Sequence, residues 1–97
     1  MGTKNNPGTF DCYQNAAPDE PMFVLLARDP LAAHLVSIWS KLRYGDVEAA
    51  SAVFADLLRK HADRYIADPD TAKASEAMDC SLAMFEWRKT HRSEVEP

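Results

Sequence analysis

Glycine is scarce in this sequence, whose 97 residues contain only Gly2, Gly8 and Gly45. A phosphate-binding loop needs several closely spaced glycines, because its backbone must approach the phosphate oxygens, so an enzyme built on such a loop is excluded. The chain also lacks the nucleophile elbow of hydrolases, a His-Glu-x-x-His zinc motif and a Cys-x-x-Cys pair. These absences predict a protein that is not an enzyme and needs no cofactor.

Cysteines and long apolar runs are equally few. Cys12 and Cys80 are too few for a disulfide scaffold, and a reducing compartment would keep them as thiols. No apolar run approaches the roughly 20 residues that span a bilayer. The opening stretch, MGTKNNPGTF, is polar and lacks the apolar centre of a signal peptide. We therefore expect a cytoplasmic protein that does not enter a membrane.

Basic charge is in deficit, since 15 acidic and 11 basic residues give a formal net charge of −4. Direct binding to nucleic acid calls for a concentrated basic face, and we expect none here. A mildly acidic chain can instead bind a protein with a basic surface. The hydrophobic fraction of 46% is typical of a small globular domain with a core of its own.

Three stretches predict helices, at residues 31–44, 46–66 and 70–91. Each follows an acidic capping residue and ends in basic side chains, as the helix dipole favours, and Gly45 provides a stop between the first two. Their apolar residues recur at helical spacing. The predicted core faces are Leu31, Leu35, Ile38 and Leu42 in the first helix; Val47, Ala50, Val53, Phe54, Leu57, Leu58, His61 and Tyr65 in the second; and Ala74, Met78, Ser81, Leu82 and Phe85 in the third.

The most apolar stretch, DEPMFVLLARDP, spans residues 19–30. Because no other segment reads as a strand that could pair with it, the interpretation is a short central helix at 21–28. The alternative is an edge strand, residues 22–27, that pairs across a dimer. The predicted fold is all-α: a small four-helix bundle-like domain over 10–92, with a flexible, irregular N-terminal arm at 1–9 and a disordered tail at 93–97.

Titratable residues offer little chemistry. The two cysteines and the three histidines have spacings that match no known metal site. His61 projects from an apolar helix face, which is typical of a core histidine with one hydrogen-bonded ring nitrogen, or of a packing element that responds to pH. His34 reads as a boundary residue. Asp68 and Asp70 are interpreted as helix caps, because no further oxygen ligand stands nearby.

One surface pattern indicates a partner. Glu76, Asp79 and Glu86 fall within a sector of about 80° on the last helix, opposite its predicted core face. Trp87 lies next to this sector, with no core neighbour to cover it. Either the N-terminal arm folds over the indole through Phe10, Cys12 and Tyr13, or the indole is an anchor for a partner. The candidate partner-binding residues are Glu76, Asp79, Glu86 and Trp87.

Residues 10–39, FDCYQNAAPDEPMFVLLARDPLAAHLVSIW, resemble small accessory proteins encoded by phages and prophages of proteobacteria. These share a Phe-Asp-Cys-Tyr element followed by the DEPMFVLLARDP stretch. The resemblance covers about a third of the chain and carries no catalytic residues. It implies a non-enzymatic phage-type inhibitor, anti-CRISPR-like, that binds a protein of a host defence complex. The alternative is a homodimeric structural or morphogenesis accessory protein of a phage that associates through residues 22–27; monomer and homodimer both stay open.

Overall fold

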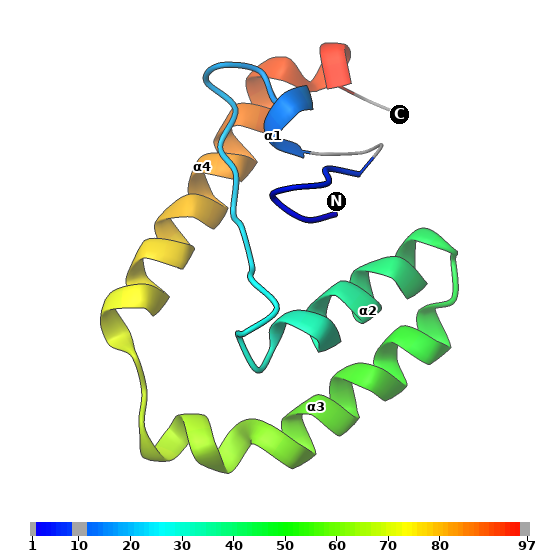
Figure 1. The fold of residues 1–97 in the computed structure, drawn as a ribbon, viewed down its shortest axis with the longest axis vertical. Coiled ribbons are helices and arrows are strands. Elements are labelled where there is room, and N and C mark those ends of the chain that lie inside the picture. Colours follow the sequence, from blue (N-terminus) through cyan, green and yellow to red (C-terminus); the bar gives the residue numbers. More distant parts are fainter. Residues whose placement is uncertain (1, 9–11, 96–97) are drawn as a thin grey trace. The chain divides into compact units, whose positions relative to one another are not determined.

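The computed structural model describes residues 2–8 and 12–95, and the fold is all-α (Figure 1). Its helices are α1 (Cys12–Asn15), α2 (Ala32–Arg43), α3 (Val47–Ala67) and α4 (Thr71–Val95). In this described part, β-type pairing is limited to one isolated bridge between Gly2 and Pro7. The described residues form two compact units: the hairpin unit, residues 24–71, and the strap unit, residues 2–23 and 72–95.

In the hairpin unit, α2 and α3 lie side by side and antiparallel, joined by a tight turn (Figure 1). Gly45 has a φ of +81°, which an L side chain rarely adopts. Its N–H donates to the carbonyl of Leu42, and the Asp46 N–H donates to the carbonyl of Lys41, a pair of bonds that closes the end of α2. The Asp46 carboxylate then accepts from the Ala49 N–H at 3.0 Å and caps α3. Both predicted signals are confirmed.

The start of α2 differs slightly from the prediction. Asp29 was expected as its N-cap, but the helix begins at Ala32 and Leu31 occupies the cap position. The Asp29 carboxylate accepts from the Leu31 N–H at 2.9 Å, and its carbonyl accepts from the Ala32 N–H. Asp29 therefore organises the turn that leads into α2 rather than the first helical turn itself.

The core of the hairpin unit is small. Ala32, Ala50 and Leu57 are the buried hydrophobic residues of the described chain, and all three lie in this unit. Ala50, Val53, Leu57 and His61 follow one another at spacings of three or four residues, so they line the side of α3 that meets α2. Of the remaining predicted core residues of α3, Tyr65 is half-buried, whereas Val47, Phe54 and Leu58 are exposed.

The predicted helix at 21–28 was wrong. Residues 20–26 are extended, and turns follow at 27–31. Glu20, just before this segment, closes a turn: its N–H donates to the Ala17 carbonyl and its carboxylate accepts from the Ala17 N–H at 3.0 Å. Six apolar residues carry no readable period, so packing rather than local preference decides their conformation. Because this segment is not a helix, the predicted four-helix bundle within one chain is not formed.

In the strap unit, residues 16–23, here called the strap, follow α1, turn at 17–20 and then run extended along α4 (Figure 1). Two contacts give its direction. The Cys80 thiol donates to the Met22 carbonyl at 3.4 Å, and His91 Nε2 lies 3.9 Å from a carboxylate oxygen of Asp19. Because the earlier strap residue meets the later helix residue, the strap runs antiparallel to α4.

The ends of the described chain carry local order. Within the segment expected to be a flexible arm, the Thr3 N–H donates to the Asn6 carbonyl at 3.0 Å, and the Asn6 N–H donates to Thr3 Oγ1 at 3.0 Å. At the other end, α4 continues to Val95, into the segment expected as a disordered tail, after an irregular backbone at His91 (φ −116°, ψ 17°).

Candidate functional site

The helix α4 presents three different faces. Cys80, Met84, Trp87 and His91 follow one another at helical spacing and form the face that meets the strap. Met78, Leu82 and Phe85 form a second, apolar stripe that is open to solvent. Glu76, Asp79 and Glu86 are exposed on a third sector. The face of α4 that packs is therefore not the predicted one, because the predicted core face is the stripe that is open to solvent.

The three acidic residues of the predicted site lie where the sequence places them. They share one sector of α4, and Asp79 and Glu86 border the open apolar stripe. Glu86 is paired loosely with Lys89, whose Nζ lies 3.7 Å from its carboxylate, and both side chains are largely exposed. Such a pair contributes little to stability, so the carboxylate stays accessible to a partner.

The sequence left two alternatives for Trp87, an indole covered by the N-terminal arm and an indole that anchors a partner. Its side chain is half-buried on the strap-facing side of α4 and stacks on His91, with ring centroids 4.2 Å apart and planes 9° apart. Its Nε1 is shielded from solvent without a hydrogen-bond partner among the described residues. The predicted alternative, a cover made by Phe10, Cys12 and Tyr13, concerns side chains outside those that the structure describes.

His91 ends the covered face and interrupts the helix. Its Nδ1 lies 3.0 Å from the Trp87 carbonyl, and the Thr90 hydroxyl donates to the same oxygen at 3.0 Å. These side chains satisfy a carbonyl where the helix backbone is irregular. The role of this cluster is structural, because it fixes the indole and the end of α4 together.

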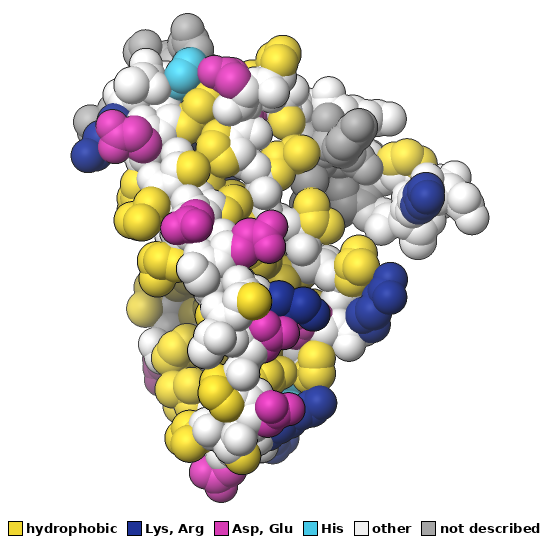
Figure 2. Space-filling view, turned by 90° about the vertical axis from the view of Figure 1, so that its left-hand side faces the viewer, with side chains coloured by type: hydrophobic (Ala, Val, Ile, Leu, Met, Phe, Trp, Pro, Cys, Tyr) yellow, Lys and Arg dark blue, Asp and Glu magenta, His cyan; other side chains and the backbone are white. Residues whose placement is uncertain are grey.

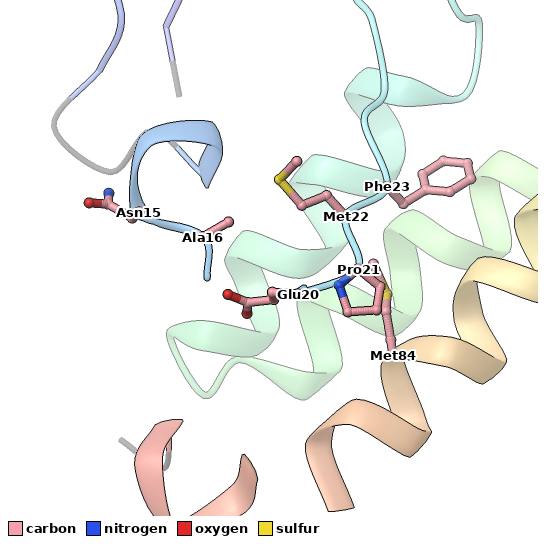
Figure 3. Close-up of a pocket in the computed structure, with 7 residues that line it drawn as sticks. All are labelled: Asn15, Ala16, Glu20, Pro21, Met22, Phe23 and Met84. Atoms are coloured by element: carbon pink, nitrogen blue, oxygen red, sulfur yellow. The ribbon is translucent and has the colours of Figure 1, made fainter. Parts of the chain in front are cut away.

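A hollow of about 380 Å³ opens between the strap and α4 (Figure 3). Met84 extends from α4 toward Pro21, and Glu20 is the one titratable side chain among the described residues that line it. The carboxylate of Glu20 already accepts from the Ala17 N–H. With a mostly apolar lining, the hollow fits an apolar side chain of a partner.

The histidines of the hairpin unit face each other across the two helices. The rings of His34 and His61 are 5.3 Å apart between centroids and tilted by 53°. Both side chains are half-buried, so His61 lies in the interface as the sequence predicts, and His34 joins it there rather than at a boundary. Among the described residues, no three His, Cys, Asp or Glu side chains gather where they could hold a metal ion.

Sequence reasoning missed the open apolar stripe as a surface, although the signal was present. Placed at about 100° per residue, the apolar residues of α4 occupy two separate sides of the helix. One side faces the strap, and the other, with Met78, Leu82 and Phe85, is exposed. Figure 2 shows hydrophobic side chains spread among acidic ones on the face that it presents.

Comparison of the chain with family models, curated proteins and solved structures finds no match. No helix in the described part of the chain is both long and apolar enough to span a bilayer. Fold and surfaces together define a small all-α chain whose helices carry open apolar faces.

Proposed function

We propose that the chain is a non-enzymatic protein that works by binding another protein through α4. The observation that carries this proposal is the open stripe of Met78, Leu82 and Phe85, which are 59%, 58% and 68% exposed. Contiguous apolar side chains with a polar border are typical of binding surfaces rather than of ordinary solvent-facing helix.

The stripe favours one mode of recognition. Its three side chains stand at i, i+4 and i+7, which is the spacing of a helix that lies in a groove of its partner. Asp79 and Glu86 line one border of the stripe. The partner is therefore a protein with an apolar groove and a basic rim, and the charges would speed association and fix its orientation. The acidic residues of the predicted site stay part of the proposed binding surface. Trp87 is not part of it, because its ring packs on the strap-facing side of α4.

The resemblance of residues 10–39 to phage and prophage accessory proteins gives the specific form of this proposal. In this form, the protein is an inhibitor of the anti-CRISPR type that acts in the cytoplasm of a bacterial host on a protein of the defence complex. The dispersed acidic residues favour steric blocking of a protein surface over imitation of DNA, which requires a continuous acidic band.

A plaque assay tests the proposal. The chain is expressed in bacteria whose CRISPR–Cas system targets an infecting phage, and plaque numbers are compared with those on cells that lack the chain. We expect wild type to restore plaques and Leu82→Asp to abolish the restoration, because a charge at the centre of the stripe removes an apolar anchor worth about 2 kcal/mol or more, roughly a 30-fold loss of affinity.

The matched control is Ala83→Asp, which places the same charge one residue further on, on the acidic side of α4. It should restore plaques as wild type does. Circular dichroism of both variants checks that helical content is unchanged. Equal loss in the two variants would contradict the stripe as the binding surface, and a wild-type chain that protects phage against none of the CRISPR–Cas types would contradict the inhibitor.

A further inference from the structure

The two half-buried histidines of the hairpin unit form a pair that the proposed function does not use. His34 lies in the first turn of α2, and His61 lies in the second half of α3. They are far apart in sequence and match no metal-binding motif, but the packing of α2 on α3 sets one ring against the other. This pair, here called the histidine clamp, lies toward the end of the hairpin that is opposite the turn at Gly45.

The ring spacing of the histidine clamp matches that of two ligands of one metal ion. Zinc binds an imidazole nitrogen at about 2.0–2.1 Å, so the ring centre lies about 3.2 Å from the ion, and two ligands at a tetrahedral angle have ring centres about 5.2 Å apart. The observed distance between the ring centres of His34 and His61 is 5.3 Å. Neighbouring ligands at right angles, as in square-planar or octahedral sites, would bring the centres to about 4.5 Å. The spacing therefore favours a tetrahedral ion.

This spacing holds whichever nitrogen each ring offers. Either nitrogen of a neutral imidazole can bind a metal, and rotation about the bond from Cβ to Cγ decides which one faces the neighbouring ring. That bond points toward the ring centre, so the rotation leaves the distance between the two centres nearly unchanged. Both side chains are half-buried, so an ion and its water ligands can reach them from solvent.

The hairpin unit gains from a cross-link because its own core is thin. Among the described residues, the buried hydrophobic ones are Ala32, Ala50 and Leu57, and two of these three are alanines. Small scaffolds with little core are commonly stabilised by a disulfide or a structural metal. The turn at Gly45 already joins one end of α2 to α3, whereas the histidine clamp lies toward the other end. A link between residues 34 and 61 would therefore close a long loop and restrict the unfolded chain.

We propose that His34 and His61 bind one zinc ion, which joins α2 to α3 at the end of the hairpin away from its turn. Two protein ligands make an open site, in which water completes the coordination of the ion. Imidazole nitrogen is a ligand that zinc prefers. The site stabilises the hairpin unit and uses no residue of α4, so it is independent of the proposed function.

Thermal melting of the purified full chain tests this site, with zinc chloride as the probe and magnesium chloride as the control. Zinc at a hundred times its dissociation constant should raise the folding equilibrium constant about a hundredfold, because the ion binds the folded chain in preference to the unfolded one. Magnesium should leave the melting temperature unchanged, because it requires oxygen ligands. A melting temperature that zinc does not raise would overturn the proposal and leave the two rings as an ordinary tilted pair. This measurement needs no variant.

Three glutamine substitutions then locate the ion. His34→Gln and His61→Gln each leave one imidazole. Each should weaken zinc binding roughly tenfold or more in titration calorimetry, because loss of a direct ligand costs at least as much as loss of an outer partner. His91→Gln, at the remaining histidine of the chain, is the matched control and should bind zinc as wild type does. Circular dichroism checks that each variant keeps its helical content. Zinc binding that survives the loss of either clamp histidine, or that is lost in His91→Gln, would contradict the site.

Discussion

The two units achieve order in opposite ways. The hairpin unit joins helices that follow each other in sequence, closes them with a tight turn at Gly45 and contains every buried hydrophobic residue of the described chain. The strap unit joins segments 58 residues apart and contains no buried residue among those described. Its two segments are joined by a thiol–carbonyl contact and a histidine–carboxylate contact, and a stacked pair of rings orders the end of α4 itself.

This difference separates two sources of stability. Burial of apolar side chains in the hairpin contributes in proportion to the area removed from water. The contacts of the strap unit are individually modest, and some of them depend on exposed polar groups. The hairpin unit should therefore respond strongly to loss of side-chain volume, and the strap unit should respond mainly to loss of specific pairs.

The largest expected effect comes from Leu57, the bulkiest buried side chain of the hairpin, which is 5% exposed. Leu57→Ala should lower the free energy of unfolding by about 2–4 kcal/mol, since it leaves a cavity between α2 and α3. Leu82→Ala, the same truncation at an open position of α4, should cost less than about 1 kcal/mol. Urea denaturation followed by circular dichroism measures both. Equal costs would erase the distinction between the two units.

An intermediate effect is expected at His91. In a Trp39→Phe background, where Trp87 is the remaining tryptophan, His91→Ala should raise quenching of its fluorescence by acrylamide. The substitution uncovers one face of the indole, and loss of the stacked pair should cost about 1 kcal/mol. Lys89→Ala, an exposed position nearby, serves as the control and should leave quenching unchanged. Unchanged quenching in His91→Ala would mean that the strap rather than the histidine shields the ring.

The smallest effect concerns an ion pair on the hairpin. A hydrogen bond from Lys60, with Arg59 close by, lowers the pKa of the Asp56 carboxyl below its usual value. A lowered folded-state pKa means that the stabilisation is present above the unfolded-state pKa and is lost as the pH falls through the folded-state value, below about pH 4. Asp56→Asn should therefore melt slightly lower than wild type at pH 7.

The melting-temperature difference between Asp56→Asn and wild type should shrink as the pH falls toward 3. It should also shrink in high salt, because the charges are exposed to solvent. A difference that grows in acid would have the wrong sign for a carboxylate stabilised by cations. Differential scanning calorimetry at several pH values measures this difference in melting temperature.

Much of the fold could be predicted from local sequence. The starts and ends of α3 and the end of α2 depend on Asp46, Gly45 and the basic residues near each terminus, and these act within a few residues of themselves. Helical periodicity gave three long helices whose observed bounds differ from the predicted ones by one or two residues, except at the end of α4. Signals of this kind need no knowledge of the rest of the chain.

Long-range packing could not be predicted in the same way. Residues 21–28 are apolar without a period, so local sequence does not decide between a helix and an extended chain. Within the strap, the contact of Met22 with Cys80 of α4 favours the extended form. The helix α4 has two apolar sides, and periodicity alone does not state which one the strap covers. The core face of α4 was placed on Met78, Leu82 and Phe85 for that reason, and these residues are exposed. The exposed positions of Glu76, Asp79 and Glu86, in contrast, follow from charge alone.

The separation between Met22 and Cys80 has a consequence for the growing polypeptide. On a ribosome the strap leaves the exit tunnel first, and its helix partner leaves last. The α2–α3 pair, in contrast, can form as soon as residue 67 is free, because closing a short loop is fast and costs little entropy. The Met22 carbonyl must therefore wait for its Cys80 partner until α4 is made, and in this interval the strap of the nascent chain is most open to chaperones or to premature association.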